Sequence, residues 1–292
     1  MTRTVTALVA ALWAASCGAP LLKLPTGPFG PASDATEAFT QATRACHTVS
    51  TITAEIAVRG KVGGRRMRAR LLAGLALESA RLEAPAPFGQ PVFIFVARAQ
   101  DATLLLPRDG RVIEHGRPDA ILEALTGISL SPSDLRSTLT GCAEAPGVAA
   151  ARQVGDEWRV IPGPREVYLR RERPADPWRV LAVVRRQPAS AEWRAEFRDF
   201  RDDLPRTIHL ASADRRRFDL TLALSQVEIN TPLGPDVFRV NVPAALKPIT
   251  IEELQRNGPL ADARAPGTWM SDSPGALSHH GKLQSSRLNR GE

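Results

Sequence analysis

Apolar residues recur along this chain at two different spacings, and each spacing predicts one kind of element. Asp34 and Glu37 stand three residues apart, which is typical of a helix N-terminus. This predicts one amphipathic helix over about 34–48, because apolar residues then recur every three or four positions. These positions are Ala35, Ala38, Phe39, Ala42, Ala45, Cys46 and Val49.

From Thr51 onward the period changes to two, which is typical of strands with one buried face. The Gly63-Gly64 pair predicts a hairpin turn, and arginines alternate with apolar residues on the returning strand. Starting residues such as Pro118 and Ser131 predict two short helices, over 118–125 and 131–139. Further strands are predicted over 80–84, 92–97, 103–106, 111–114, 157–161, 166–171, 178–186, 191–200, 207–211, 218–229 and 237–240.

From these elements we expect a fold of about eleven strands with one N-terminal helix and a pair of central helices. Short turns between successive strands indicate an antiparallel meander. Two helices inserted into a strongly curved sheet could cover one of its open ends. The predicted fold class is therefore mainly β with helices.

Residues 1–16 have the features of a secretory signal peptide. Arg3 precedes an apolar run over 5–15, which is too short for a membrane span of roughly twenty residues, and three small residues lead to Cys17. A cysteine at this point suggests the lipobox of bacterial lipoproteins, in which it becomes the lipidated N-terminus, although alanine stands where leucine is commonest. The alternative is an ordinary signal peptide cleaved beside an incidental cysteine.

The rest of the chain divides into three stretches. Residues 17–32 contain four prolines, and we expect a lipidated cysteine followed by a flexible tether. Residues 33–259 fit one domain, and residues 260–292 lack any period, so we expect a disordered tail. Gly18 stands where lipoproteins retained in the inner membrane usually carry aspartate, which is compatible with an outer-membrane anchor facing the periplasm.

The formal net charge of +7 does not make nucleic acid an expected partner. Of the 38 basic residues 34 are arginines, and along the sequence they are spread over strands and loops. Solvated arginines explain this pattern, with attraction to anionic lipid headgroups as a weaker functional interpretation.

Two cysteines remain in the body, Cys46 and Cys142. An even pair in an oxidising compartment favours one disulfide, whose loop of about 95 residues contributes up to about 4–5 kcal/mol in the chain-entropy description. The alternative is a metal site that uses both cysteines and His47, but it lacks ligand spacing and a fourth ligand. We expect no metal and no cofactor.

No catalytic constellation can be assembled from the sequence. None of the five histidines stands in a hydrolase or metalloprotease motif. The glycines of 60–64 lack the spacing of a phosphate loop, and the acidic residues of 198–203 are explained by a solvated turn. We therefore do not expect an enzyme.

Several short stretches in a fixed order resemble one family. They are VRGK at 58–61, PFG at 87–89, TLLL at 103–106, ILEALTG at 121–127 and LR at 135–136 before Gly141. This arrangement resembles the LolB family of outer-membrane lipoproteins, within the wider LolA/LolB half-barrel group.

The resemblance implies an unclosed antiparallel barrel around an apolar cavity, with the helices as a lid. In that family the cavity accepts the acyl chains of lipoproteins that a periplasmic LolA-like carrier delivers. Phe88 falls at the loop where family members carry a protruding apolar residue for membrane contact. The alternative for Phe88 is a side chain that folds back into the core.

The inward strand positions are candidates for lining the cavity, and the alternative is that they simply fill a solid core. They are Ile56, Val58, Leu71, Leu82, Phe93, Phe95, Leu105, Trp193, Phe197 and Leu222. The sequence thus predicts a membrane-anchored protein of the cell envelope that binds acyl chains. The alternative function is a structural or accessory lipoprotein subunit of an envelope complex.

Overall fold

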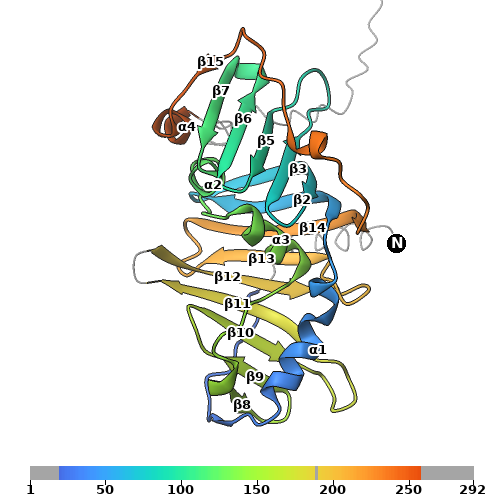
Figure 1. The fold of residues 1–292 in the computed structure, drawn as a ribbon. Helices are drawn as coiled ribbons and strands as arrows, with labels where there is room; N and C mark the ends of the chain where they lie inside the picture. The colour runs from blue at the N-terminus through green and yellow to red at the C-terminus, as the bar shows by residue number, and fades with distance from the viewer. Residues whose placement is uncertain (1–19, 188–189, 258–292) are drawn as a thin grey trace, which may run out of the picture.

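A single sheet runs through the computed structural model, which describes residues 20–187 and 190–257 (Figure 1). Its 15 strands follow the order β1-β8-β9-β10-β11-β12-β13-β14-β2-β3-β4-β5-β6-β7-β15. All neighbours are antiparallel except β7 and β15, which are parallel. The end strands β1 and β15 do not pair with each other, so the barrel is unclosed.

Helices and strands follow one another in two runs. The first contains β1 (Gly30–Pro31), α1 (Ala35–His47), β2 (Ile52–Val62), β3 (Arg65–Leu75), β4 (Ser79–Ala84), β5 (Phe93–Arg98), β6 (Asp101–Leu106) and β7 (Arg111–Gly116). Two helices follow, α2 (Pro118–Thr126) and α3 (Pro132–Thr140). The second run contains β8 (Arg152–Val154), β9 (Trp158–Ile161), β10 (Arg165–Arg170), β11 (Arg179–Gln187), β12 (Ser190–Arg198), β13 (Thr207–Ser212), β14 (Phe218–Ile229), η4 (Pro235–Phe238), β15 (Lys247–Pro248) and α4 (Ile251–Asn257).

The two runs join where β14 pairs with β2 in the middle of the sheet. Gly60 of β2 lies opposite Leu220 with a φ of +147°. A Cβ atom there would lie 2.0 Å from the carbonyl oxygen of Asp219, so this close approach requires glycine. The pairing that joins the two runs therefore depends on a residue without a side chain.

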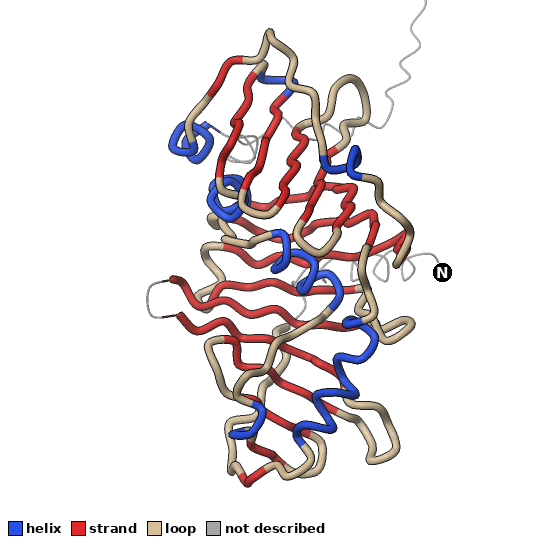
Figure 2. Tube along the Cα trace, viewed as in Figure 1, coloured by secondary structure: helices blue, strands red, loops and turns tan. Residues whose placement is uncertain are grey.

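All four helices contribute to one face of the sheet, which we call the inner face (Figure 2). Helix α1 lies across β9, β10 and β11, α3 contacts β3 and β4, and α2 contacts β6 and α4. Apolar side chains from the helices and from most strands form one buried cluster on this face. The predicted fold class, mainly β with an N-terminal helix and a central helix pair, is confirmed.

Some predicted elements were wrong in detail. The described residues form 15 strands rather than about eleven. Among those that were missed, β1, β8 and β15 are only two or three residues long and carry no readable period. The strand predicted over 237–240 is absent, since Pro235 opens the 3-10 helix η4 there. Helix α4 was not predicted.

Asp34 does not cap α1 with its side chain. Its carboxylate instead accepts hydrogen bonds from Arg159 of β9, at 2.5 Å from Nε and 2.9 Å from Nη2. This hydrogen-bonded pairing with Arg159 lowers the pKa of Asp34. The residue chosen from the sequence as a cap therefore fastens the start of α1 to the sheet.

The flexible tether predicted over 17–32 was wrong for the residues that the structure describes. The N–H of Leu22 donates to Glu196 Oε1 at 2.8 Å, and Leu24 packs against apolar residues of β9–β11. Gly30 and Pro31 pair with β8. The segment stays in place because the sheet offers it both buried charges and an apolar surface. The signal peptide, Cys17 and the stretch 260–292 lie outside the described residues.

Candidate functional site: the inner face and its helical lid

Nine of the ten residues predicted to line a cavity lie in the inner-face cluster. Six are buried, namely Ile56, Val58, Leu82, Phe93, Phe95 and Phe197. Three more are partly buried and packed against these, namely Leu71, Trp193 and Leu222. They come from strands β2–β5, β12 and β14, which curve around the helices, so the fold brings together residues that lie far apart in the sequence.

Leu105 was assigned to the wrong face. Its neighbours Leu104 and Leu106 belong to the inner-face cluster, and side chains alternate along a strand. Leu105 therefore points to the opposite, outer face, where it lies across from Ile94 and Val112. It is buried there and cannot line the inner face.

Helix α3 is held over the inner face by polar contacts at its start and at its middle. Ser131 and Asp134 form a capping box, with each backbone N–H bonded to the other side chain at 3.1 Å. Arg165 of β10 donates to the Asp134 carboxylate. Arg136 donates from Nη1 to the carbonyl oxygen of Val49 at 3.0 Å.

The charge of Asp134 depends on these partners. Burial acts to raise the pKa of its carboxyl group, but Arg165 and the hydrogen bonds from Ser131 outweigh burial. The pKa of Asp134 therefore lies below its ordinary value, and the group is ionised at neutral pH. The start of α3 thus carries a negative charge, which its N-terminal dipole also favours.

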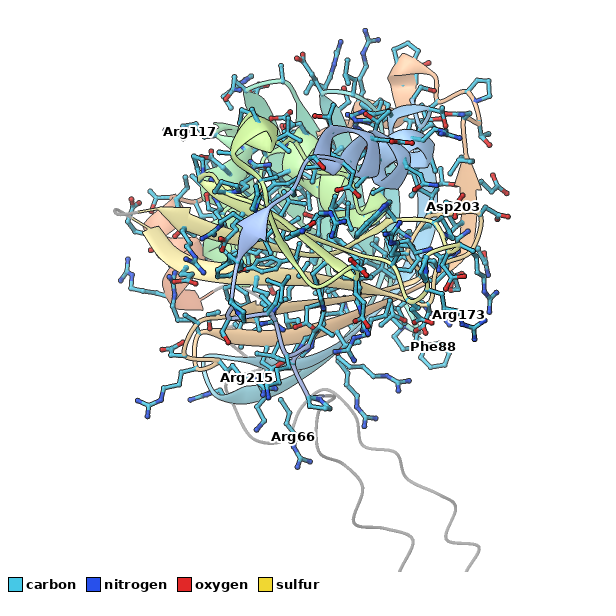
Figure 3. The ribbon with its side chains drawn as sticks, turned by 90° about the horizontal axis from the view of Figure 1, so that it is seen from below. Arg66, Phe88, Arg117, Arg173, Asp203 and Arg215 are labelled. Carbon is cyan, nitrogen blue, oxygen red and sulfur yellow. A yellow bond between two sulfur atoms is a disulfide. The ribbon has the colours of Figure 1, made fainter. Side chains whose placement is uncertain are left out.

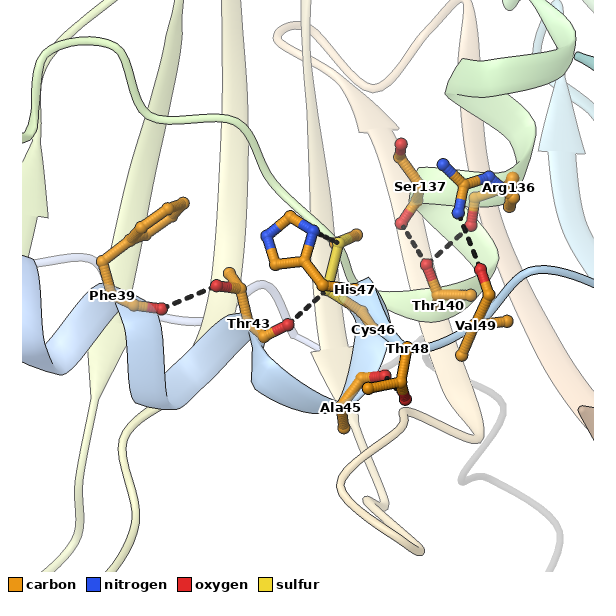
Figure 4. The surroundings of a disulfide bond; sticks show 11 residues. Phe39, Thr43, Ala45, Cys46, His47, Thr48, Val49, Arg136, Ser137 and Thr140 are labelled. Atoms are coloured by element: carbon orange, nitrogen blue, oxygen red, sulfur yellow. Dashed lines mark hydrogen bonds between the residues drawn. A yellow bond between two sulfur atoms is a disulfide. The ribbon is translucent and has the colours of Figure 1, made fainter. Parts of the chain in front are cut away.

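A disulfide between Cys46 and Cys142 ties the end of α1 to the residues after α3 (Figure 4). The two sulfur atoms lie 2.09 Å apart and the two Cα atoms 5.4 Å apart. His47 Nδ1 lies 4.0 Å from the sulfur of Cys142. This trio is compact enough to hold a metal ion, but sulfur atoms bonded to each other are not thiolate ligands.

A cavity beneath α3 is small. A cavity of about 30 Å³ lies between α3 and strands β10–β12, and Trp193 and Phe197 line it together with Asp134. That volume matches roughly one water molecule. The side chains predicted to surround a ligand therefore pack against the helices here, and an acyl chain would need α3 to move.

A larger cleft of about 540 Å³ lies on the outer face, beneath the N-terminal segment. Leu24 and Phe29 line it together with Arg152, Arg186 and Tyr168. Glu166 already binds both arginines and accepts a hydrogen bond from Tyr168 at 2.7 Å. Because its charges are neutralised internally, this cleft is a weak candidate for an anion site.

Sequence reasoning missed a buried charge cluster beside this cleft. Glu196 is fully buried and receives hydrogen bonds from Arg194 and Arg198. His209 lies next to it, with Nδ1 4.0 Å from Glu196 Oε2 and Nε2 2.6 Å from Asp219 Oδ1. The alternation of charged and apolar residues along β12 was the available signal, but a charged strand face is ordinarily exposed to solvent. The N-terminal segment and the neighbouring strands are what bury it.

Phe88 is 89% exposed at the tip of the loop between β4 and β5. Figure 3 shows its ring at the rim of the molecule. Arg108 supports the loop from behind, donating to the carbonyl oxygens of Phe88 at 3.3 Å and Gln90 at 3.2 Å. The ring therefore projects outward from a supported turn instead of folding into the core.

Among the described residues, no helix has the length and apolar character needed to cross a membrane.

Comparison with known proteins gives similarity at the level of the fold. No family model and no curated protein matches the chain. A LolA superfamily protein of Nitrosomonas europaea is similar over 70% of this chain and 97% of its own, with 13% identity and a TM-score of 0.51. The fold is that of a LolA-like half-barrel.

Two further solved structures are similar over comparable lengths. One is a putative outer membrane lipoprotein-sorting protein domain from Vibrio parahaemolyticus, with 13% identity over 70% of this chain and 97% of that chain and a TM-score of 0.44. The other is a DUF1329 family protein from Desulfovibrio piger, with 11% identity, 71% and 98% coverage and a TM-score of 0.45. The narrower resemblance to LolB stays a prediction.

Proposed function

We propose that the protein is a lipid-anchored component of the cell envelope whose inner face binds acyl chains. In this proposal Cys17 carries the anchor in the outer membrane, and the body faces the periplasm. The acyl chains belong to lipoproteins that a LolA-like carrier delivers, and the protein helps to place them in the membrane. No cofactor and no catalytic step are involved.

The observation that carries this proposal is the continuous apolar cluster under a separate pair of helices. Apolar residues from most strands and from helices α1–α4 meet there. If α3 moved aside, these side chains would present an apolar trough, and apolar burial would drive acyl chains into it. The half-barrel shared with a LolA superfamily protein supports the same interpretation.

Native mass spectrometry of the mature chain, with Cys17 replaced by serine to keep it soluble, tests this function. We expect co-purifying lipid or saturable binding of a fluorescent fatty acid. A body that stays free of lipid and does not bind the probe would contradict the proposal.

The anchor itself is tested in cells. Cys17→Ser should release the protein from the membrane fraction into the periplasm, because the acyl chains then have no attachment site. Retention of the variant in the membrane after a wash with about 1 M salt, which screens electrostatic contacts, would contradict lipidation at this residue.

Phe88 is proposed to contact the membrane during transfer, since an exposed aromatic ring favours the bilayer interface. Phe88→Glu should weaken binding to vesicles and slow transfer of lipoprotein, while Phe88→Trp should preserve both. Unchanged transfer by the glutamate variant would remove Phe88 from the mechanism.

A second candidate is a structural or accessory subunit whose half-barrel is permanently filled. The small cavity beneath α3 favours it. Pull-down of the lipidated protein from envelope extract should then recover a stoichiometric protein partner, with no acyl-probe binding. Probe binding without such a partner would reject this alternative.

A further inference from the structure

Five basic residues gather on the outer face of β2 and β3. Arg59 lies directly opposite Arg68, and Lys61 lies opposite Arg66. Arg66, Arg68 and Arg70 share one face of β3, since Met67 and Ala69, which alternate with them, point inward. All five basic residues are exposed. We call Arg59, Lys61, Arg66, Arg68 and Arg70 the basic face.

Along the sequence these basic residues alternate with others on two successive strands. The pairing of the two strands brings them together on one surface. Opposed residues of an antiparallel pair have Cβ atoms only about 5 Å apart, and like charges at this distance repel. The chain places two such pairs side by side. A surface of this kind is stabilised when an external anion lies against it.

Internal counter-charges are scarce on the basic face. Arg70 lies 3.5 Å from Glu55. In residues 20–187 and 190–257, the other four make no hydrogen bond or ion pair. Asp219 lies opposite Lys61 on the adjoining β14, but His209 and Arg215 already occupy its two oxygens.

The direction of this surface is visible in Figure 3, where Arg66 projects from the side away from the helices and Arg117, before α2, lies on the helix side. Arg215 projects beside Arg66 from the neighbouring turn between β13 and β14. The basic face therefore points away from the lid and the inner-face cluster.

The described part of the N-terminal segment, residues 20–32, starts on this same outer face. Arg198 donates from Nη2 to the carbonyl oxygen of Pro20 at 2.8 Å. The strand registers connect Arg198 to Thr207, Ala223, Ala57 and finally Arg70 in one row. Four strand spacings of about 4.8 Å separate the row's ends by about 19 Å. Three residues from Pro20 back to Cys17 reach at most about 11 Å further.

We propose that the basic face docks on the anionic phospholipid headgroups of the membrane that holds the anchor. This inference rests on the proposed lipid anchor, which would tether the outer face close to the bilayer. The lid side would then face the periplasm, open to an incoming carrier. Headgroup phosphates fit the site because arginine binds them with two parallel hydrogen bonds and needs no apolar pocket.

Vesicle co-sedimentation of the mature chain carrying Cys17→Ser isolates this contact from the anchor. The probes are phosphatidylcholine vesicles with and without phosphatidylglycerol. The chain with no other substitution should bind the anionic vesicles much more tightly than the phosphatidylcholine vesicles. Binding should fall steeply between about 0.1 M and 1 M salt, as the screening length shrinks from about 10 Å to 3 Å.

The triple variant Arg59→Gln, Arg66→Gln, Arg68→Gln removes three charges from the basic face. Each basic residue near an anionic surface contributes roughly fivefold to binding, so about a hundredfold loss is expected. The matched control removes three exposed arginines elsewhere and should bind nearly as the parent. It carries the substitutions Arg44→Gln, Arg173→Gln and Arg201→Gln.

Equal binding by the two triple variants would overturn the proposal, and so would binding that ignores phosphatidylglycerol. Binding to heparin without binding to anionic vesicles would also overturn it and would assign the face to a soluble polyanion. Should the triple variant fold poorly, the salt and lipid dependence of the parent still decides the question. Acyl-probe binding is measured separately, so its failure is distinguishable from failure of docking.

Discussion

Asp134→Asn tests whether α3 is the lid that admits acyl chains. The substitution keeps a side-chain oxygen that can accept from the N–H of Ser131, so the helix cap survives. It removes the charge that pairs with Arg165. The change therefore loosens the attachment of α3 to β10 without altering the apolar side chains beneath it.

The expected magnitude follows from the exposure of the two partners. The Asp134 side chain is 15% exposed and that of Arg165 is 38% exposed, so the pair is partly screened by solvent. A charge-assisted hydrogen bond in such a place contributes about 1.5 kcal/mol, the low end of its usual range. If only α3 is released, its open state becomes about tenfold more populated.

Two measurements follow from this shift. Apparent affinity scales with the fraction of binding-competent molecules, so the fluorescent fatty acid should bind about tenfold more tightly while that fraction is small. The melting temperature should fall by about 3–5 °C for a domain of this size. Asp236→Asn is the control, because it removes a carboxylate from an exposed pair with Arg239 at 3.5 Å, far from the lid in sequence. It should change neither quantity.

A lower melting temperature with unchanged affinity would refute the role of α3 as a lid. Weaker binding would refute it too, because the ion pair would then support the ligand site instead of closing it. A parent protein that binds no fatty acid at all would instead reject the proposed function, so the two failures are distinct.

Three further predictions concern stability. Gly60→Ala should lower the free energy of unfolding in urea by about 3 kcal/mol, since its Cβ would meet the Asp219 carbonyl. The control Gly64→Ala has open space around the added Cβ and should cost only about 1 kcal/mol, so similar losses in both variants would contradict the close approach at Gly60. Replacing Cys46 and Cys142 together by alanine should lower the free energy of unfolding by about 4–5 kcal/mol, because a long loop is no longer closed. Alkylation of the unfolded Cys17→Ser chain should find no free thiol. A reactive thiol, or an unchanged urea midpoint in the double alanine variant, would contradict the disulfide. The folded-state pKa of Asp134 lies below its unfolded value of about 3.9. The ion pair therefore stabilises the fold fully above about pH 4, and this contribution is lost as pH falls through the folded-state pKa. Asp134→Asn should make the urea midpoint less sensitive to acid, and the same pH dependence in parent and variant would contradict the pairing.

Local elements were predictable because their signals are local. Helix α1 follows from the spacing of its apolar residues, and the turn at 63–64 follows from its glycine pair. Helices α2 and α3 follow from a proline in the first turn and, for α3, from a capping box. The ladders of β2 and β14 carry a clear period of two. The short strands β1, β8 and β15 carry none, because they exist only through their partners.

The run of three leucines at 104–106 explains the error at Leu105. Three apolar residues in succession leave the direction of each side chain undetermined. Pairing with β5 and β7 decides it, since Leu104 lies opposite Phe95 and Ile113. For the other candidate residues the buried side of the strand was predictable, because there single apolar residues alternate with polar ones.

The sequence by itself determined the class of fold, the order of its long elements and the apolar side of most strands, because hydrophobic period and turn chemistry act over short distances. Only the tertiary structure decided how full the inner face is, since that depends on how closely α3 packs against strands far away in sequence. It also decided that the N-terminal segment is held by Glu196 and Arg198, and that scattered arginines form one basic face. Strand pairing creates these arrangements, and a register between distant strands is not written in any single stretch of the chain.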